Sequence, residues 1–356
     1  MKKIKKKNNN SLITNILFSI IALFAVTVSI IFLLLNYSLK SEIQSIKDEN
    51  DFLLQYKDNH PYSEDDISVI KEEVKKEQSD EEKQILLSQI KDIMNNGYSA
   101  YYLMRNLYPD DVVVMADSKY LFFPIDDSMK KNNYDINNFV QDEETKEVSY
   151  IDPDNKVKTK KGIDVSSFNG KIDWSKVKKD GIDFAFIRVG YRGSTEGALK
   201  LDTTFEYNIQ NAIKNGIDVG VYFFTQAINE DEAIKEAQFV MDAIEPYQLT
   251  YPVVYDVEAY QGGRAENIGS EQQTKNTIAF LDTVKNSGYE PMVYSNLNGL
   301  FVMQDIKKLE SYKKWFAYYI YPMYYPYDLY IWQYSSSGKV SGISGDVDMN
   351  ICFKNE

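Results

Sequence analysis

The glycines of this chain are confined almost entirely to its second part, and this is the strongest constraint on how it folds. Of the 17 glycines, 16 lie between Gly162 and Gly345, and none precedes Gly97. The same segment holds all three tryptophans, Trp174, Trp315 and Trp332. Glycine marks tight turns, and tryptophan marks a substantial core or a binding groove. We therefore expect a turn-rich globular domain at residues 161–356 and a different kind of structure before it.

The composition excludes several classes of protein. The 356 residues include one His and one Cys, which are too few for a His-rich metal site, a zinc knuckle or a disulfide framework. The formal net charge of −13 argues against nucleic-acid binding, because that function needs a basic face. We therefore expect no metal, no cofactor and no nucleic-acid partner.

An uncharged apolar segment, residues 12–35, predicts a membrane anchor. It contains ITNILFSIIALFAVTVSIIFLLL, which is 23 residues long, whereas about 20 residues cross a bilayer. Five lysines precede it in the tail 1–11, and the positive-inside rule places that tail in the cytoplasm. The alternative is a cleaved signal peptide, but its apolar core spans only about 7–15 residues and ends in small residues. We expect a single-pass plasma-membrane protein. Without the five lysines of the tail, its exported part has a formal net charge of −18.

Residues 36–96 read as a charged helical stalk. They contain no glycine, and apolar residues recur at helical spacing, as in Ile67, Ile70 and Val74. The pattern breaks at His60-Pro61. A short coiled coil would make the chain a weak homodimer. Because the segment has fewer than three unbroken heptads, a solvated amphipathic helix or spacer is favoured instead.

The next segment, residues 97–160, is expected to be a small membrane-proximal module followed by a linker. The sequence VVVMADSKYLFFPI, from Val112 to Ile125, predicts two strands joined at Ala116-Asp117-Ser118. The stretch after these strands is rich in Asn, Asp and Lys and reads as loop. The whole segment offers no chemical motif.

Strand-like apolar runs alternate with helical patterns throughout residues 161–356. Eight candidate strands begin at Gly162, Phe184, Val219, Pro252, Pro291, Trp315, Leu329 and Asp346. Helical patterns intervene at residues 174–179, 202–215, 230–244, 270–287 and about 297–309. This alternation implies an α/β fold with a mostly parallel sheet. Eight strands in about 195 residues predict a TIM-like (β/α) barrel with fewer than eight helices, incomplete on its later side.

Acidic side chains stand at several predicted strand ends, where barrel enzymes gather their active sites. Asp256 and Glu258 lie at i and i+2 on one strand, so they share a face, with Cβ atoms about 6.5–7 Å apart. Asp164 ends the first strand, and Asp348 lies on the eighth, its neighbour in a closed barrel. An isolated acidic pair is more often a solvated strand end. Four acids at one edge favour glycoside hydrolysis, because buried like charges destabilise unless they have a function.

Aromatic, amide and basic residues accompany the acids at the same strand ends. Sugars offer C–H faces for stacking and hydroxyls for hydrogen bonds, so these residue types suit a carbohydrate groove. The substrate-binding candidates are Arg188, Tyr191, Tyr222, Tyr294, Asn296 and Gln333. Arg188 is expected either to bridge the acids or to neutralise them inside the barrel. The acids of residues 230–245 read instead as a solvated helix face.

The motifs of this domain resemble glycoside hydrolase family 25, the Chalaropsis-type lysozymes or N-acetylmuramidases. The resemblance covers about residues 161–353 and lies in GIDVSSFNGKIDW, FAFIRVGYRG, VGVYFFTQA, PVVYDVE, YSNLNGL and WQYSSSGKVSGISGDVDMNIC. It implies a flattened eight-stranded barrel that hydrolyses the β-1,4 bond between N-acetylmuramic acid and N-acetylglucosamine in peptidoglycan. The glycan strands of peptidoglycan would be its substrate.

The resemblance also implies roles for single residues. Glu258 matches the general acid, and Asp256 matches the partner carboxylate that orients or stabilises the substrate's N-acetyl group. The two flanking acids are matched by Asp164 and Asp348. Groove positions are matched by Tyr222, Tyr294 and Gln333. The chain departs from the family at Phe223, where many members have His, and in the run of residues 319–330, which adds aromatic residues.

Several alternatives stay open. A chitinase or endo-glucosaminidase type of N-acetyl-hexosaminidase has a similar barrel, and a weakly active cell-wall-binding scaffold would share the fold without the chemistry. Attack by the substrate's 2-acetamido group is favoured over an inverting mechanism. An anchored enzyme acts close to its own cell, so we expect cell-wall remodelling rather than secreted killing.

Overall fold

The computed structural model describes residues 29–48 except 31 and 35, residues 64–96, residues 100–154 and residues 156–355. The chain forms two compact units, Met1–Tyr108 and Pro109–Glu356. Most of the predicted membrane anchor therefore lies outside the described residues. Within the part of the chain that is described, no helix is both long and apolar enough to cross a bilayer.

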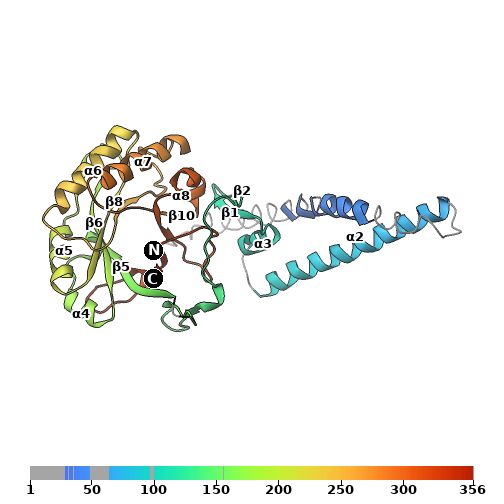
Figure 1. Cartoon of the computed structure of the whole chain (residues 1–356), viewed down its shortest axis with the longest axis horizontal. Helices are drawn as coiled ribbons and strands as arrows, with labels where there is room; N and C mark the ends of the chain where they lie inside the picture. The colour runs from blue at the N-terminus through green and yellow to red at the C-terminus, as the bar shows by residue number, and fades with distance from the viewer. Residues whose placement is uncertain are drawn as a thin grey trace, which may run out of the picture. The chain divides into compact units, whose positions relative to one another are not determined.

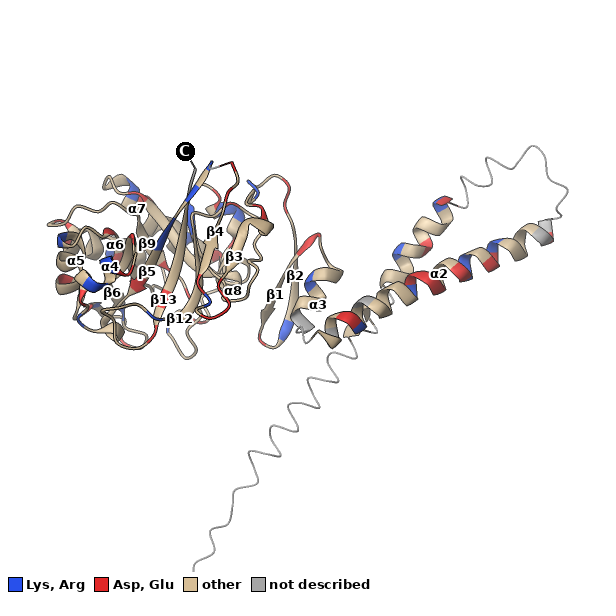
Figure 2. Ribbon diagram, turned by 90° about the horizontal axis from the view of Figure 1, so that it is seen from below, with Lys and Arg blue, Asp and Glu red and all other residues tan. Residues whose placement is uncertain are grey.

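The first unit is helical wherever it is described. Residues 36–48 are helical, followed by α2 (Glu64–Asn95, 32 residues) and α3 (Ala100–Leu107). Since neither Gly nor Pro occurs within α2, the helix continues past the predicted stripe of Ile67, Ile70 and Val74 without a break. Acidic and basic residues alternate along its length (Figure 2). The predicted break at His60-Pro61 lies outside the described residues, and the coiled coil stays a prediction.

A closed eight-stranded barrel dominates the described part of the second unit (Figure 1). Its strands are β5 (Val157–Val165), β6 (Phe184–Arg192), β8 (Asp218–Phe224), β9 (Val253–Asp256), β10 (Pro291–Asn296), β11 (Lys313–Ala317), β12 (Ile331–Gly338) and β13 (Val347–Asn355). Each strand pairs with the next in this order, and β5 pairs with both β6 and β13, which closes the barrel. The prediction of a TIM-like barrel with eight strands is confirmed.

The last strand runs against its neighbours. The pairs from β5 to β12 are parallel, whereas β13 is antiparallel to both β12 and β5. The start of β13, rather than its end, therefore lies where the parallel strands end, and Asp348 pairs there with Asp164. A short strand that the sequence pattern missed, β7 (Leu199–Leu201), pairs antiparallel with the end of β6.

Helices cover the outside of the barrel on the side of its early strands (Figure 1). They are α4 (Trp174–Lys179), α5 (Phe205–Lys214), α6 (Glu230–Ile244), α7 (Ser270–Asn286) and α8 (Leu297–Phe301). The expected helix over residues 297–309 is divided into α8 and a 3-10 turn, Ile306–Leu309. No helix joins β11 to β12 or β12 to β13 in the described residues, so the predicted shortage of helices is confirmed.

Aromatic rings fill the inside of the barrel beneath the predicted site. The rings of Phe186 and Trp315 stack with centroids 4.6 Å apart, and Cys352 is buried in the same cluster. Gly162 and Gly220 make room for this packing, because a Cβ atom at either position would collide with a phenylalanine ring. The aromatic layer forms a solid floor beneath the strand ends.

The segment before the barrel packs against it and belongs to the same compact unit. It forms the hairpin β1 (Asp111–Ala116) and β2 (Lys119–Pro124), followed by the short pair β3 (Phe139–Gln141) and β4 (Val148–Tyr150). The two strands predicted between Val112 and Ile125 are thus present.

Tyrosine hydroxyls from residues 319–330 hold this N-terminal segment in place. The Tyr324 hydroxyl donates to the Asp111 carbonyl at 2.8 Å, and the Tyr321 hydroxyl donates to the Phe139 carbonyl at 2.7 Å. The Tyr327 hydroxyl accepts a hydrogen bond from the Asp126 backbone N–H at 2.9 Å. Much of the aromatic run of residues 319–330, which departs from the family, therefore forms the surface on which the segment with β1 to β4 packs.

Candidate active site

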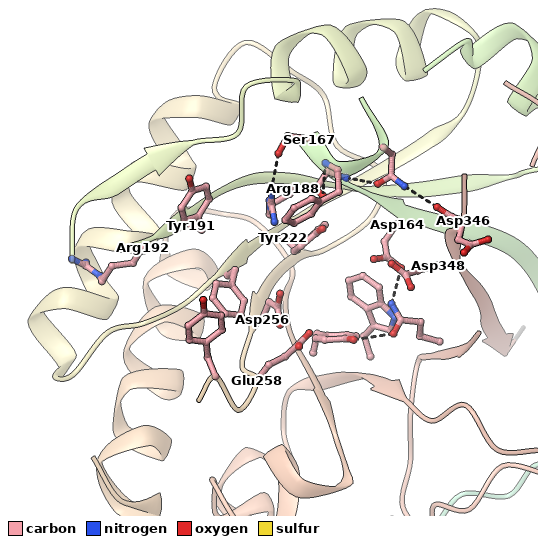
Figure 3. Close-up of a pocket in the computed structure, with 18 of the residues that line it drawn as sticks. Asp164, Ser167, Arg188, Tyr191, Arg192, Tyr222, Asp256, Glu258, Asp346 and Asp348 are labelled. Atoms are coloured by element: carbon pink, nitrogen blue, oxygen red, sulfur yellow. Dashed lines mark hydrogen bonds between the residues drawn. The ribbon is translucent and has the colours of Figure 1, made fainter. Parts of the chain in front are cut away.

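All four predicted acids line one cavity of about 810 Å³ at the edge where the parallel strands end (Figure 3). Asp164 comes from β5, Asp256 ends β9, Glu258 follows two residues later, and Asp348 comes from the start of β13. Aromatic residues form much of the wall, namely Phe168, Tyr191, Tyr222, Phe224, Tyr260, Tyr294, Trp315 and Tyr319. The closed barrel thus brings together acids that lie up to 184 positions apart in the sequence.

Two amide side chains hold Asp164. Its Oδ2 atom accepts hydrogen bonds from Gln333 Nε2 and from Asn350 Nδ2, both at 2.8 Å. Trp315 Nε1 in turn donates to Asn350 Oδ1 at 2.7 Å. Burial and the charge of Asp348 raise the pKa of Asp164 well above its ordinary value, although the two amides oppose that shift. Asn350 was missed in the sequence, yet its position two residues after Asp348 places both on one strand face.

Asp256 and Glu258 form a close pair. The two carboxyl groups act on each other, and this interaction raises the pKa of Asp256 and lowers the pKa of Glu258. Burial raises the pKa of both groups, and the charge of Glu258 raises the pKa of Asp256 further. The Oδ1 atom of Asp256 is buried and has no hydrogen-bond partner. The pair can hold a proton between its members and still offer one free acceptor to a ligand.

Asp348 extends the acidic cluster toward β5. Burial and the charge of Glu258 raise its pKa to about 6. Because four carboxyl groups share one cavity, ionisation of one disfavours ionisation of the next. The cluster therefore retains protons at a pH at which ordinary carboxyl groups have lost them. Among the described residues, no group of His, Cys, Asp or Glu side chains is placed to hold a metal ion.

Arg188 lies beside the acids but is held by a partner of its own. Its Nε atom donates to Asp202 Oδ2 at 2.9 Å, and its Nη2 atom donates to Ser167 Oγ at 3.0 Å. The guanidinium also lies over the rings of Phe168 and Tyr191, at 5.2 and 5.4 Å from their centroids. Its charge lowers the pKa of Asp256. Asp202, which is buried and anchors this cation, was not foreseen because it follows β7, a strand that the sequence pattern missed.

A chain of polar contacts links the tyrosines to the acids. The hydroxyls of Tyr294 and Tyr319 both donate to Gln333 Oε1, at 2.8 and 2.7 Å. Tyr294 also lies beside the carboxyl group of Glu258 and lowers its pKa. Tyr222 packs edge-on against Trp315 on the cavity floor, with centroids 6.1 Å apart.

Asn296 lies apart from the other predicted site residues. Its side chain is exposed, and its Oδ1 atom accepts a hydrogen bond from the Gly299 backbone N–H at 3.0 Å. This contact caps the N-terminus of α8. Asn296 does not line the cavity in the described structure.

One acid of α6 departs from the solvated face expected for residues 230–245. Glu236 is fully buried, and its Oε1 atom accepts a hydrogen bond from Arg192 Nε at 2.7 Å. Its Oε2 atom accepts from Thr225 Oγ1 at 2.8 Å and from the Tyr255 hydroxyl at 2.7 Å. The expectation was wrong for Glu236, because Arg192 at the end of β6 supplies a buried cation. This network fixes the ends of β6, β8 and β9 beneath the cavity.

The barrel and its cluster of carboxyl groups define a glycoside hydrolase. The chain belongs to glycosyl hydrolases family 25, which residues 163–343 match. Over 206 residues it is 32% identical to the uncharacterized protein YegX of Escherichia coli (strain K12), an alignment that covers 53% of this chain and 68% of YegX. It is 29% identical over 192 residues to the autolytic lysozyme of Clostridium acetobutylicum, covering 53% of this chain and 55% of that protein.

A solved structure shares this fold. The modular autolysin LytC from Streptococcus pneumoniae, in complex with a synthetic peptidoglycan ligand, superposes with a TM-score of 0.51 and 28% sequence identity. The match covers 68% of this chain and 52% of LytC. This chain thus spans about half the length of that autolysin.

Proposed function

We propose that this chain is a membrane-anchored, extracytoplasmic lysozyme that hydrolyses the β-1,4 bond between N-acetylmuramic acid and N-acetylglucosamine in peptidoglycan. The observation that carries the proposal is the convergence of Asp164, Asp256, Glu258 and Asp348 on one aromatic-walled cavity. The relative from Clostridium acetobutylicum is named an autolytic lysozyme, which agrees with this substrate. We assign the enzyme to remodelling of the cell's own wall.

Glu258 acts as the general acid in this proposal. Its raised pKa keeps a proton available for the oxygen of the leaving sugar, and Tyr294 holds its carboxyl group in place. The unpartnered Oδ1 atom of Asp256 accepts the N–H of the substrate's 2-acetamido group. The acetamido oxygen then attacks C1 while Glu258 protonates the departing oxygen, and water opens the resulting oxazolinium ion. The charge of Asp256 stabilises that cation.

The remaining site residues bind and position. Asp164 and Asp348 flank the reacting sugar and stabilise the positive charge that develops on it. Tyr191 and Tyr222 offer ring faces to the sugar, whereas Gln333 and Tyr294 position Asp164 and Glu258.

The stereochemical outcome separates two mechanisms. Attack by the acetamido group retains the β configuration at C1, whereas direct attack by water inverts it. Proton NMR of the first products, recorded before the anomers equilibrate, is expected to show the β anomer. An initial α anomer would eliminate the substrate-assisted step.

Analysis of reducing ends tests the proposed reaction. The full chain, purified in detergent, is incubated with defined peptidoglycan, and the products are reduced with borohydride and identified by mass spectrometry. We expect reduced muramic acid. Reduced glucosamine would instead assign the chain to the glucosaminidases. If the glycan stays intact, the chain is a wall-binding scaffold and not a lysozyme.

Residues 12–35 are proposed to anchor the enzyme, with the N-terminus in the cytoplasm and the barrel outside. The support is the charge-free apolar sequence and the five lysines before it. The full chain is expected to stay in the membrane fraction after alkaline carbonate washing, and protease added to intact spheroplasts should digest the barrel. Release of the full chain by carbonate would contradict the anchor.

A further inference from the structure

A second cavity of about 550 Å³ adjoins the catalytic cavity. Glu258 and Tyr260 line both cavities, so the second one opens directly beside the proposed general acid. Its other walls come from the loops that follow β8 and β9, from α8 and the residues after it, and from the tip of the β1–β2 hairpin. The hairpin lies before residues 163–343, so this wall is outside the part of the chain that matches the family.

The hairpin tip is held firmly in this position. Asp117 and Ser118 form a two-residue turn, with φ of 48° and 60°. The body of the hairpin contacts α8, and the rings of Phe123 and Phe301 lie 5.6 Å apart (Figure 1). The Tyr324 hydroxyl accepts from the Val113 backbone N–H at 3.1 Å and donates to the Asp111 carbonyl. These contacts place Ala116 and Asp117 at the wall of the second cavity.

The chemistry of the second cavity differs from that of the catalytic cavity. Tyr260 supplies the one aromatic ring among its described lining residues, so the cavity offers little surface for stacking sugars. Amide side chains take the place of rings, namely Gln226, Gln261, Asn267, Gln273 and Asn298. The Oδ1 atom of Asn298 is buried without a hydrogen-bond partner, so an incoming N–H group would satisfy it. Amide donors and acceptors of this kind match a peptide backbone.

The charge of the second cavity is of one sign. The charged residues among its described lining are Asp117, Glu258 and Glu266, all of them acidic. Asp117 and Glu266 are exposed at the rim, where they would face a ligand as it enters. A cavity lined in this way attracts a cationic group and disfavours a carboxylate.

We propose that the second cavity binds the stem peptide that muramic acid carries, and that it favours a stem with a free amino group. This inference rests on the proposed function, because the stem is attached to the sugar that would occupy the catalytic cavity. The glycan lies along the aromatic walls, and its peptide branch enters beside Glu258 toward Asn298. The amino group of the stem then meets Asp117 and Glu266 at the rim.

Three forms of one substrate test the inference. Uncross-linked glycan strands are used with their stem peptides intact, with the amino groups of the stems acetylated, and with the stems removed by an amidase. Asp117→Asn is the test variant, because Asn tolerates the left-handed turn and removes only the charge. Glu143→Gln, a charge removal at an exposed position outside both cavities, is the matched control.

Asp117→Asn is expected to lower kcat/KM about three- to tenfold on intact strands and to leave it unchanged on acetylated and stripped strands. Glu266→Gln should show the same pattern, and Glu143→Gln should match the parent chain on all three substrates. An equal loss on stripped strands, or no loss on intact strands, would overturn the inference. If the parent chain releases no muramic acid reducing ends from any strand, the proposed function itself fails.

Discussion

The chemistry of the site depends on carboxyl groups that lie close together and whose negative charges repel one another. Glu258 raises the pKa of Asp256, and Asp164 and Asp348 lie opposite each other on paired strands. Each carries a pKa above its ordinary value, mainly because of burial. An acid cluster of this kind supplies a proton at neutral pH, at a cost in folding stability.

Asp348→Asn is therefore expected to stabilise the protein at neutral pH. The pKa of Asp348 is raised from 3.8 to about 6, so its contribution to stability is full below pH 3.8 and is lost as the pH rises through about 6. Removing the charge should increase the free energy of unfolding at pH 7 by about 3 kcal/mol. Urea unfolding followed by tryptophan fluorescence measures this difference.

The size of the effect must also change with pH as this account requires. The gain from Asp348→Asn should disappear near pH 3.5, where the parent carboxyl group is already protonated. A variant that is less stable than the parent chain at pH 7 would show that Asp348 is held as a favourable charge.

At the scale of single elements, α6 supports the active site through one buried acid. Glu236 pairs with Arg192 at the end of β6, and Arg192 also donates to the Gly197 carbonyl at 2.6 Å and to the Glu232 carbonyl at 2.9 Å. Tyr255, which donates to Glu236, is the residue before Asp256 on β9. The helix thus fixes the strand that carries the catalytic pair.

Glu236→Gln should destabilise the protein strongly. It removes the carboxylate that accepts a hydrogen bond from the buried Arg192 guanidinium and leaves only Glu232, whose Oε2 atom lies 3.9 Å from Nε. Breaking a buried ion pair in this way typically costs about 3–5 kcal/mol. The matched control is Asp242→Asn, an exposed acid on the same helix, which should change stability by less than about 0.5 kcal/mol. Urea unfolding midpoints of the two variants measure both effects, and equal midpoints would contradict the structural role of the network.

At the scale of the whole molecule, the barrel depends on the segment that precedes it. Val112, Val113 and Val114 of β1 are almost fully buried, and the tyrosines of residues 319–330 bond to the backbone of this segment. The contacts of this segment therefore stabilise the barrel and also hold the wall of the second cavity in place.

Truncation separates the two compact units. Removing residues 1–108 should leave the melting temperature unchanged, because Pro109–Glu356 forms one unit. Removing residues 1–151 should lower it by about 5–10 °C, since it exposes three buried valines and the surface that held them. Differential scanning calorimetry of the two truncated chains measures the difference, and equal melting temperatures would show that the docked segment adds no stability.

The sequence predicted the barrel well because its signals are local. Strands of a parallel barrel read as continuous apolar runs, and α4, α6 and α7 follow clear helical patterns, so their positions could be placed within a few residues. The acids were found because Asp256 and Glu258 share a strand face and because closure makes the first and eighth strands neighbours. The direction of β13 could not be read, since the two-residue period is the same in either direction.

The sequence failed where contacts are neither periodic nor local. The partner of Arg188 is Asp202, which follows a strand of only three residues. The segment before the barrel is rich in Asn, Asp and Lys, and it docks through hydrogen bonds to tyrosine hydroxyls that leave no pattern in the sequence. Burial of Glu236 depends on Arg192, 44 positions away.

The central claim is that Glu258 supplies the proton for cleavage of a muramic acid glycosidic bond. The most direct test compares the full chain with its Glu258→Gln variant by the rate at which muramic acid reducing ends are released from peptidoglycan. The account predicts a loss of about 10²–10⁴-fold with an unchanged near-ultraviolet circular dichroism spectrum, because the amide cannot donate the proton. A variant that releases these ends at the parent rate would contradict it.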